Sequence, residues 1–168
     1  MNENAERPVA KADPGIYSKL RLFALSKELP AAPDGTIFAV LMDGHVPNGT
    51  YTAIAFWDGD ASLYMSSGGG FIGGARQFPE IREAALMAIG VAADSLAHFS
   101  VTEEFELPGP GDVRFFIRTR EGVRSATVAS SCIQNGTHPL VVLSAAMQRI
   151  VTTYRLRFPR PQPAKKPQ

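Results

Sequence analysis

One stretch organises the chain: Ser66-Ser67-Gly68-Gly69-Gly70-Phe71-Ile72-Gly73-Gly74-Ala75. It lies between a predicted short strand, which begins at Ala61, and the longest helix that the sequence predicts, Pro79 to Phe99. Proline suits the first position of a helix, where its missing N–H is not needed. The apolar stripe of this helix recurs at spacings of three and four residues: Ile81, Ala85, Ala88, Ala92, Leu96 and Phe99.

Before this stretch, the sequence predicts a helix from Gly15 to Leu29 and a strand from Thr36 to Met42. The strand is apolar at nearly every position, which is typical of a strand covered on both faces or on one face with a partner element. A second strand, Thr50 to Trp57, is expected to turn back through Asp58-Gly59 into the third.

A two-residue turn at Asp58-Gly59 sets Ile54 opposite Leu63 and Phe56 opposite Ala61. One face of this predicted hairpin is entirely apolar, which indicates that it packs in the core. It carries Phe56, Ile54, Ala61, Leu63 and Met65. The other face is aromatic and polar, with Tyr51, Ala53, Trp57, Ser62, Tyr64 and Ser66.

A second hairpin is predicted from Asp112 to Arg120 and from Val123 to Ser130, about Glu121-Gly122. Its core face would carry Val113, Phe115, Ile117, Ala126 and Val128. The opposite face would carry Arg114, Phe116, Arg118 and Arg120. A final helix is expected to begin near Pro139, capped by Thr137 or His138.

This order of one helix, three strands, a helix, two strands and a helix predicts an α+β fold with two layers. The expected sheet is five-stranded and mostly antiparallel, with the helices packed on one face. We predict a single domain over residues 15–157, a disordered N-terminal lead over 1–14, and a proline-rich basic tail over 158–168.

Composition limits the class of function. The 168 residues carry 17 basic and 16 acidic side chains, so a dedicated nucleic-acid-binding protein is not expected. The single cysteine, Cys132, cannot form an internal disulfide. No secretory signal or membrane-spanning run is visible, and we expect a cytoplasmic protein.

The glycine run contains Gly68-x-Gly70-x-x-Gly73, the spacing of a dinucleotide-binding fingerprint. A loop formed by Gly68, Gly69, Gly70, Gly73 and Gly74 could hold a phosphate or another anion at the start of the Pro79 helix. Several residues separate the motif from Pro79, and the preceding strands are joined by hairpins. These features favour an ordinary wide connection instead.

Catalytic and metal-binding patterns are weak. His45, His98 and His138 lie far apart and lack ligand partners at useful spacing. Cys132 has no recognisable nucleophile signature around it, and no Gly-x-Ser-x-Gly motif is present. The sequence predicts neither a cofactor nor a metal, and a small enzyme of unknown reaction is the third of three hypotheses.

The first hypothesis is a non-catalytic binding or assembly module. If both hairpins join one sheet, its uncovered face gathers aromatic and arginine side chains, the types that are enriched at interaction hot spots. They are Tyr51, Trp57, Tyr64, Arg114, Phe116, Arg118 and Arg120. We expect this face to bind a second copy, as a homodimer, or another protein. Anion binding by the glycine loop is the alternative.

Overall fold

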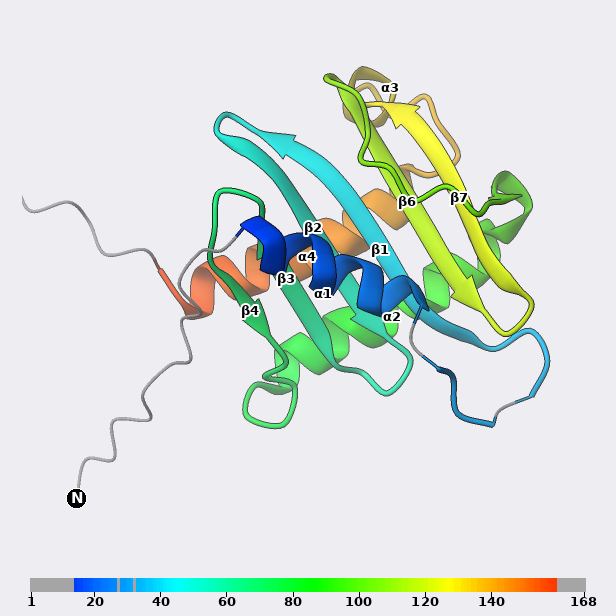
Figure 1. Cartoon of the computed structure of the whole chain (residues 1–168), viewed down its shortest axis with the longest axis horizontal. Coiled ribbons are helices and arrows are strands. Elements are labelled where there is room, and N and C mark those ends of the chain that lie inside the picture. The colour runs from blue at the N-terminus through cyan, green and yellow to red at the C-terminus, as the bar shows by residue number, and fades with distance from the viewer. Residues whose placement is uncertain (1–13, 27, 32, 160–168) are drawn as a thin grey trace, which may run out of the picture.

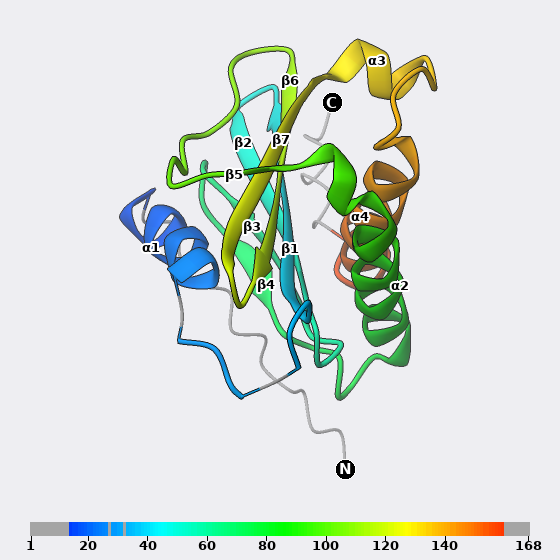
Figure 2. The same ribbon diagram turned by 90° about the vertical axis from the view of Figure 1, so that its right-hand side faces the viewer.

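The protein is built on one antiparallel sheet with helices on both faces. The computed structural model describes residues 14–26, 28–31 and 33–159. The strand order is β4-β3-β2-β1-β6-β7-β5. Helices α2 and α4 cover one face, and α1 lies on the other (Figures 1 and 2). The predicted α+β class with an antiparallel sheet is confirmed, but the sheet has seven strands instead of five, and the helices do not share one face.

The elements have these bounds: α1 (Pro14–Ser26), β1 (Ile37–Val46), β2 (Gly49–Phe56), β3 (Ala61–Met65), β4 (Gly70–Ile72), α2 (Pro79–Ser95), a 3-10 turn (Leu96–His98), β5 (Ser100–Val101), β6 (Asp112–Thr119), β7 (Gly122–Ala129), α3 (Ser130–Gln134) and α4 (Val141–Arg157). The short strands β4 and β5 and the short helix α3 were not predicted. Among the described residues, no helix is long and apolar enough to cross a membrane.

Strand β1 lies at the centre of the sheet, between β2 and β6. Its side chains alternate between two cores: Val40 and Met42 pack under α2 and α4, whereas Ala39 and Leu41 pack under α1. Burial on both sides explains why the strand is apolar at nearly every position. The α2 stripe includes Ala84, Ala85, Ala88 and Ala92, all fully buried, and these small side chains bring the helix close to the sheet.

The predicted register of the first hairpin is wrong by one residue. Phe56 donates its N–H to the carbonyl of Asp60, and Gly59 adopts a positive φ of 87°. The connection is therefore a three-residue loop, Trp57 to Gly59, that ends in a left-handed glycine. As a result Ile54 pairs with Ser62 rather than with Leu63.

A one-residue slip moves side chains to the other face of a sheet. Ala61, Leu63 and Met65 indeed face α2 and α4, but the other two residues of the expected core face, Ile54 and Phe56, lie under α1.

The second hairpin has the predicted alternation. Phe115 pairs with Ala126 and Phe116 with Ser125. Val113, Phe115, Ile117, Ala126 and Val128 all belong to the core under α2 and α4. The final helix begins at Val141, two residues after Pro139, but the predicted cap is wrong. The N-cap residue is Leu140, with no side-chain cap hydrogen bond, and the Nδ1 atom of His138 accepts the N–H of Leu140 in the turn before the helix.

The predicted lead and tail fall mainly on residues 1–13 and 160–168, which lie outside the described residues. Phe158, which we placed in the tail, packs instead against the body of the protein. Its ring stacks on Phe71 at 4.9 Å and meets Phe78 edge-on at 5.4 Å. The described part of the chain thus continues past α4 to this aromatic contact.

Candidate functional site

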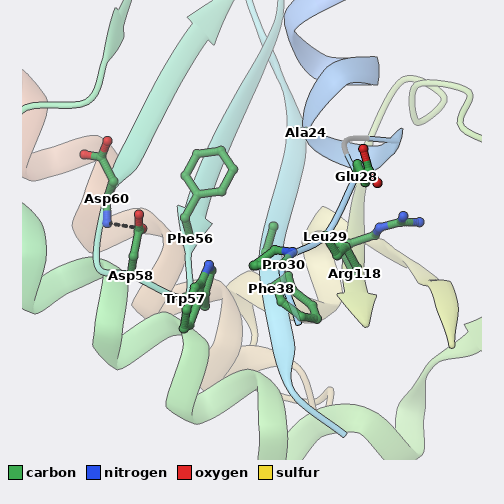
Figure 3. A pocket seen from close by; sticks show the side chains of 11 residues that line it. Ala24, Glu28, Leu29, Pro30, Phe38, Phe56, Trp57, Asp58, Asp60 and Arg118 are labelled. Carbon is green, nitrogen blue, oxygen red and sulfur yellow. Dashed lines mark hydrogen bonds between the residues drawn. The ribbon is translucent and has the colours of Figure 1, made fainter. Parts of the chain in front are cut away.

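A pocket of about 180 Å³ lies on the α1 face of the sheet, beyond the C-terminal end of α1 (Figure 3). We call it the Trp57 pocket. Three aromatic side chains from β1, β2 and the loop that follows β2 form its apolar part, and four charged side chains stand around them. Its lining residues are Ala24, Glu28, Leu29, Pro30, Phe38, Ala39, Phe56, Trp57, Asp58, Asp60 and Arg118.

A β-bulge shapes the floor of the Trp57 pocket. The pairing of β1 with β6 shifts between Ile37 and Ala39, so these two residues face opposite sides of the sheet and Phe38 stands out of the ladder. Bulges often redirect a side chain in this way. The Phe38 ring meets the Trp57 ring edge-on at a centroid distance of 6.0 Å.

Trp57 combines a fixed backbone with an accessible ring. Its N–H donates to the carbonyl of Phe38 at 3.0 Å. Phe38 itself is only 2% exposed, whereas 46% of Trp57 remains exposed. An indole held in place in this way offers a large contact area without the loss of much side-chain freedom on binding.

Hydrogen bonds hold the loop that carries Trp57. Asp58 accepts the N–H of Asp60 through its Oδ1 atom at 3.1 Å. From helix α2, the Nη1 atom of Arg82 donates to the carbonyl of Asp58 at 2.6 Å. A side chain at Gly59 would come within 2.8 Å of Arg82, so the loop and the helix fit closely. The part of the pocket that carries Trp57 is therefore held in place by contacts with α2.

The charged side chains occupy two sides of the Trp57 pocket. Figure 3 shows Asp58 and Asp60 on one side and Glu28 and Arg118 on the other, with the aromatic rings between them. Arg118 pairs with Ala39 across the bulge, and its buried Nε atom has no hydrogen-bond partner among the described residues. Three carboxylates against one guanidinium give the lining an excess of negative charge.

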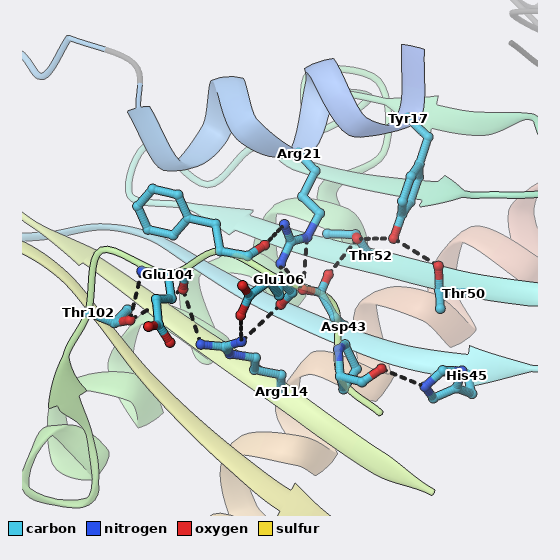
Figure 4. A network of polar contacts seen from close by, with 12 residues as sticks. Tyr17, Arg21, Asp43, His45, Thr50, Thr52, Thr102, Glu104, Glu106 and Arg114 are labelled. Atoms are coloured by element: carbon cyan, nitrogen blue, oxygen red, sulfur yellow. Dashed lines mark hydrogen bonds and ion pairs between the residues drawn. The ribbon is translucent and has the colours of Figure 1, made fainter. Parts of the chain in front are cut away.

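The rest of this sheet face is closed by α1 and by the loop before β6, and one arginine joins them (Figure 4). Arg21 of α1 binds the Oδ2 atom of Asp43 on β1 through Nε at 2.9 Å and Nη2 at 2.6 Å. Its Nη1 atom donates to the carbonyl of Phe105. The side chains of Arg21 and Asp43 are 5% and 0% exposed, so this is a buried ion pair.

Hydroxyl groups complete this network. Thr52 donates to the Oδ1 atom of Asp43 at 2.5 Å, and its oxygen lies 2.9 Å from the hydroxyl of Tyr17 on α1. Thr50 donates to the same Tyr17 hydroxyl at 3.2 Å. Burial raises the pKa of the Tyr17 phenol. The polar groups between α1 and the sheet are thus satisfied by one another, which is typical of a structural contact.

The structure separates the residues that we predicted for a binding face. Trp57 and Arg118 meet at the Trp57 pocket. Tyr64 and Phe116 lie on the same side of the sheet but are buried in the core under α1. Tyr51 lies on the opposite face, where its hydroxyl accepts a hydrogen bond from Gln148 of α4 at 2.7 Å.

The two remaining arginines of this set also differ in their surroundings. Arg114 donates to the carbonyls of Glu104 and Glu106, each at 3.1 Å. Its guanidinium lies 5.0 Å from the centre of the Phe116 ring, and the guanidinium of Arg21 lies 5.1 Å from it. Arg120 is exposed, just past the end of β6. A continuous open face of aromatic and arginine side chains is therefore not what the structure presents.

The glycine run forms a hairpin. Gly68 and Gly69 make the turn between β3 and β4 with positive φ angles, and Gly70 lies so close to β3 that a Cβ atom would come within 2.4 Å of the Leu63 carbonyl. Gly73 and Gly74 lead from β4 towards α2. The carboxylate of Asp60 stands beside Gly73 and accepts the N–H of Ala75 at 3.5 Å, which places a negative charge at this loop.

Two of the histidines, His45 and His138, form hydrogen bonds with the backbone. The Nε2 atom of His45 lies 3.0 Å from the carbonyl of Pro108 and 2.9 Å from that of Gly109, and the Nδ1 atom of His138 accepts the N–H of Leu140 in the turn before α4. Within the described part of the chain, no group of three or more His, Cys, Asp or Glu residues could hold a metal ion.

Sequence reasoning missed most of the Trp57 pocket. Phe38 was read only as part of a buried strand, because a bulge leaves no signature in a run of apolar residues. Glu28 was predicted inside the first helix, Gly15 to Leu29, and Pro30 directly after it, and we placed that helix on the other face of the sheet. Asp58 was interpreted only as a turn residue. The one local signal of the pocket was an aromatic residue next to this turn, in Trp57-Asp58-Gly59.

Comparison with known proteins gives no family. No protein-family model matches the chain, and no curated protein or solved structure matches it either.

Proposed function

We propose that this protein is a non-catalytic binding module that receives a segment of another protein chain in the Trp57 pocket. One observation carries the proposal: the only tryptophan of the chain is fixed at its backbone, set edge-on against buried Phe38, and still half exposed. Tryptophan and arginine are among the residue types most enriched at the energetic centre of protein interfaces, and here Trp57 and Arg118 line one pocket.

The size of the pocket favours a protein segment over a cofactor or a nucleotide. Pockets for drug-sized ligands hold roughly 300–1,000 Å³. The Trp57 pocket, at about 180 Å³, suits a single anchoring side chain or a short turn of chain. Its mixed lining of rings, carboxylates and one guanidinium offers such an anchor both apolar contact and polar partners.

The proposal can be tested by selecting from a displayed library of random peptides on the wild-type protein. We expect enriched peptides that bind the wild type but lose binding to the Trp57→Ala and Arg118→Ala variants. Leu156→Ala is a matched control, because Leu156 is an exposed apolar side chain of α4 on the opposite side of the sheet. If every enriched peptide bound the Trp57→Ala variant as well as the wild type, the proposal would be wrong.

A further inference from the structure

The Trp57 pocket and the C-terminal segment of the chain have complementary chemistry. Residues 160–168 read Arg-Pro-Gln-Pro-Ala-Lys-Lys-Pro-Gln, with three basic residues, three prolines and no acidic residue. We propose that the pocket binds this segment of a second copy of the chain. The inference rests on the proposed function and names its partner.

The apolar part of the match is proline against aromatic rings. Proline-rich segments bind aromatic-lined grooves because their extended conformation is preformed and costs little entropy to fix. In the Trp57 pocket, Phe38 forms the floor, and the half-exposed indole of Trp57 and the ring of Phe56 stand beside it (Figure 3). Pro30 and Leu29 close the pocket on the α1 side.

Charge complements the apolar contact. Glu28 and Asp58 are both exposed at the rim, so their carboxylates are accessible to the basic residues Arg160, Lys165 and Lys166. Asp60 also lines the pocket, although its carboxylate is shared with the N–H of Ala75. Arg118 and the nearby Arg82 reduce this negative charge but do not cancel it, because three carboxylates stand against two guanidinium groups.

The position of Phe158 favours a second copy over the same chain. Its ring packs against Phe71 and Phe78 in the core under α2 and α4. The Trp57 pocket lies on the α1 side of the sheet, where Ala24 and Ala39 line it. Nine residues in an extended proline-rich conformation span about 28 Å. Crossing two layers of about 10 Å each would use most of that length. Exchange between two copies leaves the whole segment free to bind, and it is reciprocal, as a symmetric dimer requires.

The first experiment uses a synthetic peptide of residues 159–168 and the fluorescence of Trp57, which is the only tryptophan. The protein in this experiment is the full chain with Arg160→Glu/Lys165→Glu/Lys166→Glu, because its own segment should no longer occupy the pocket of a second copy. We expect the wild-type peptide to change the Trp57 emission of this variant. A control peptide in which Arg160, Lys165 and Lys166 are replaced by glutamine should bind about tenfold more weakly or worse. An emission that does not respond to the peptide would overturn the inference.

The second experiment measures mass by light scattering on the full chain. We expect a dimer for the wild type and a monomer for two charge variants: Arg160→Glu/Lys165→Glu/Lys166→Glu in the segment and Glu28→Lys/Asp58→Asn in the pocket. Mixing the two variants should restore a dimer, because a reversed segment then meets a reversed pocket. A monomeric wild type would overturn the assignment to a second copy, even if the peptide binds.

The two proposals can fail separately. If library peptides bind in a Trp57-dependent way but the peptide of residues 159–168 does not, the proposed function stands and this inference is wrong. If no peptide of either kind depends on Trp57, both are wrong.

Discussion

Replacing Arg21 with methionine is expected to lower the free energy of unfolding by about 4 kcal/mol. The reason lies in Asp43, whose side chain is fully buried and accepts two hydrogen bonds from Arg21. Without Arg21, the hydroxyl of Thr52 is the one remaining hydrogen-bond donor to this carboxylate among the described residues. Breaking a buried ion pair by removing one partner typically costs 3 to about 5 kcal/mol, since the other charge stays buried and uncompensated.

The assay is urea unfolding at neutral pH, followed by far-UV circular dichroism. With an m-value of about 2 kcal/mol per molar urea, the midpoint should fall by about 2 M. Lys19→Ala is a matched control, because Lys19 is an exposed cation on the same helix, and its midpoint should not move. The double variant Arg21→Met/Asp43→Leu should be more stable than Arg21→Met, because it no longer buries a charge.

Two outcomes would refute this reasoning. One is a loss of less than about 1 kcal/mol for Arg21→Met, which would mean that the carboxylate finds other compensation. The other is a double variant less stable than either single variant, which would mean that packing by these side chains matters more than charge.

Three further predictions concern other parts of the molecule. Burial raises the pKa of all four tyrosines, Tyr17, Tyr51, Tyr64 and Tyr154, so the folded protein should form less tyrosinate near pH 10 than the unfolded chain. Stability should fall as pH rises above the unfolded value of 10.0, because the unfolded chain then loses protons that the folded state keeps. Absorbance at alkaline pH and unfolding measured against pH check this prediction. Gly44→Ala should destabilise the protein by about 1–3 kcal/mol, since its Cβ atom would lie 2.7 Å from the Tyr51 ring. Gly90→Ala, with open space on an exposed turn of α2, should instead stabilise the protein by about 0.5–1 kcal/mol. Thermal melts of both variants check these two values. Trp57→Ala should cost no more than about 1.5 kcal/mol in urea unfolding, because nearly half of the side chain is already exposed; a larger loss would make Trp57 a core residue rather than a binding residue.

The α+β class and most of the longer elements could be predicted from the sequence because each carries a local signal. Helix α2 has its proline start and its alanine stripe, and the hairpin of β6 and β7 alternates cleanly between two faces. The final helix begins at Val141, close to the start near Pro139 that the sequence predicts. In each case the residues that decide the structure lie within a few positions of one another.

The register of the first hairpin could not be predicted, because it depends on a single loop residue. Asp58-Gly59 fits a two-residue turn as well as it fits the end of the observed three-residue loop. The difference moves Ile54 and Phe56 to the other side of the sheet. The position of α1 depends on Arg21 and Asp43, which are far apart in sequence and whose pairing no local pattern reveals.

Only part of the candidate site could be predicted, because the rest of it depends on contacts between residues far apart in sequence. Trp57 and Arg118 were identified as binding residues, and the structure brings them to one pocket. The bulge at Phe38 and the position of Glu28, which follows α1, depend on contacts between residues far apart in sequence. Phe116, which alternation places correctly on the α1 side of the sheet, is buried there by a cover that alternation cannot predict.

The most direct test of the proposed function is the nuclear magnetic resonance signal of one N–H group. Because the chain has one tryptophan, a ¹⁵N-labelled sample gives a single indole resonance, from Trp57. On titration with a peptide selected on the wild-type protein, we predict that this resonance shifts together with the backbone signals of Phe38 and Arg118. A peptide that binds but shifts only resonances elsewhere, and leaves the indole signal in place, would contradict the proposal that the Trp57 pocket is the binding site.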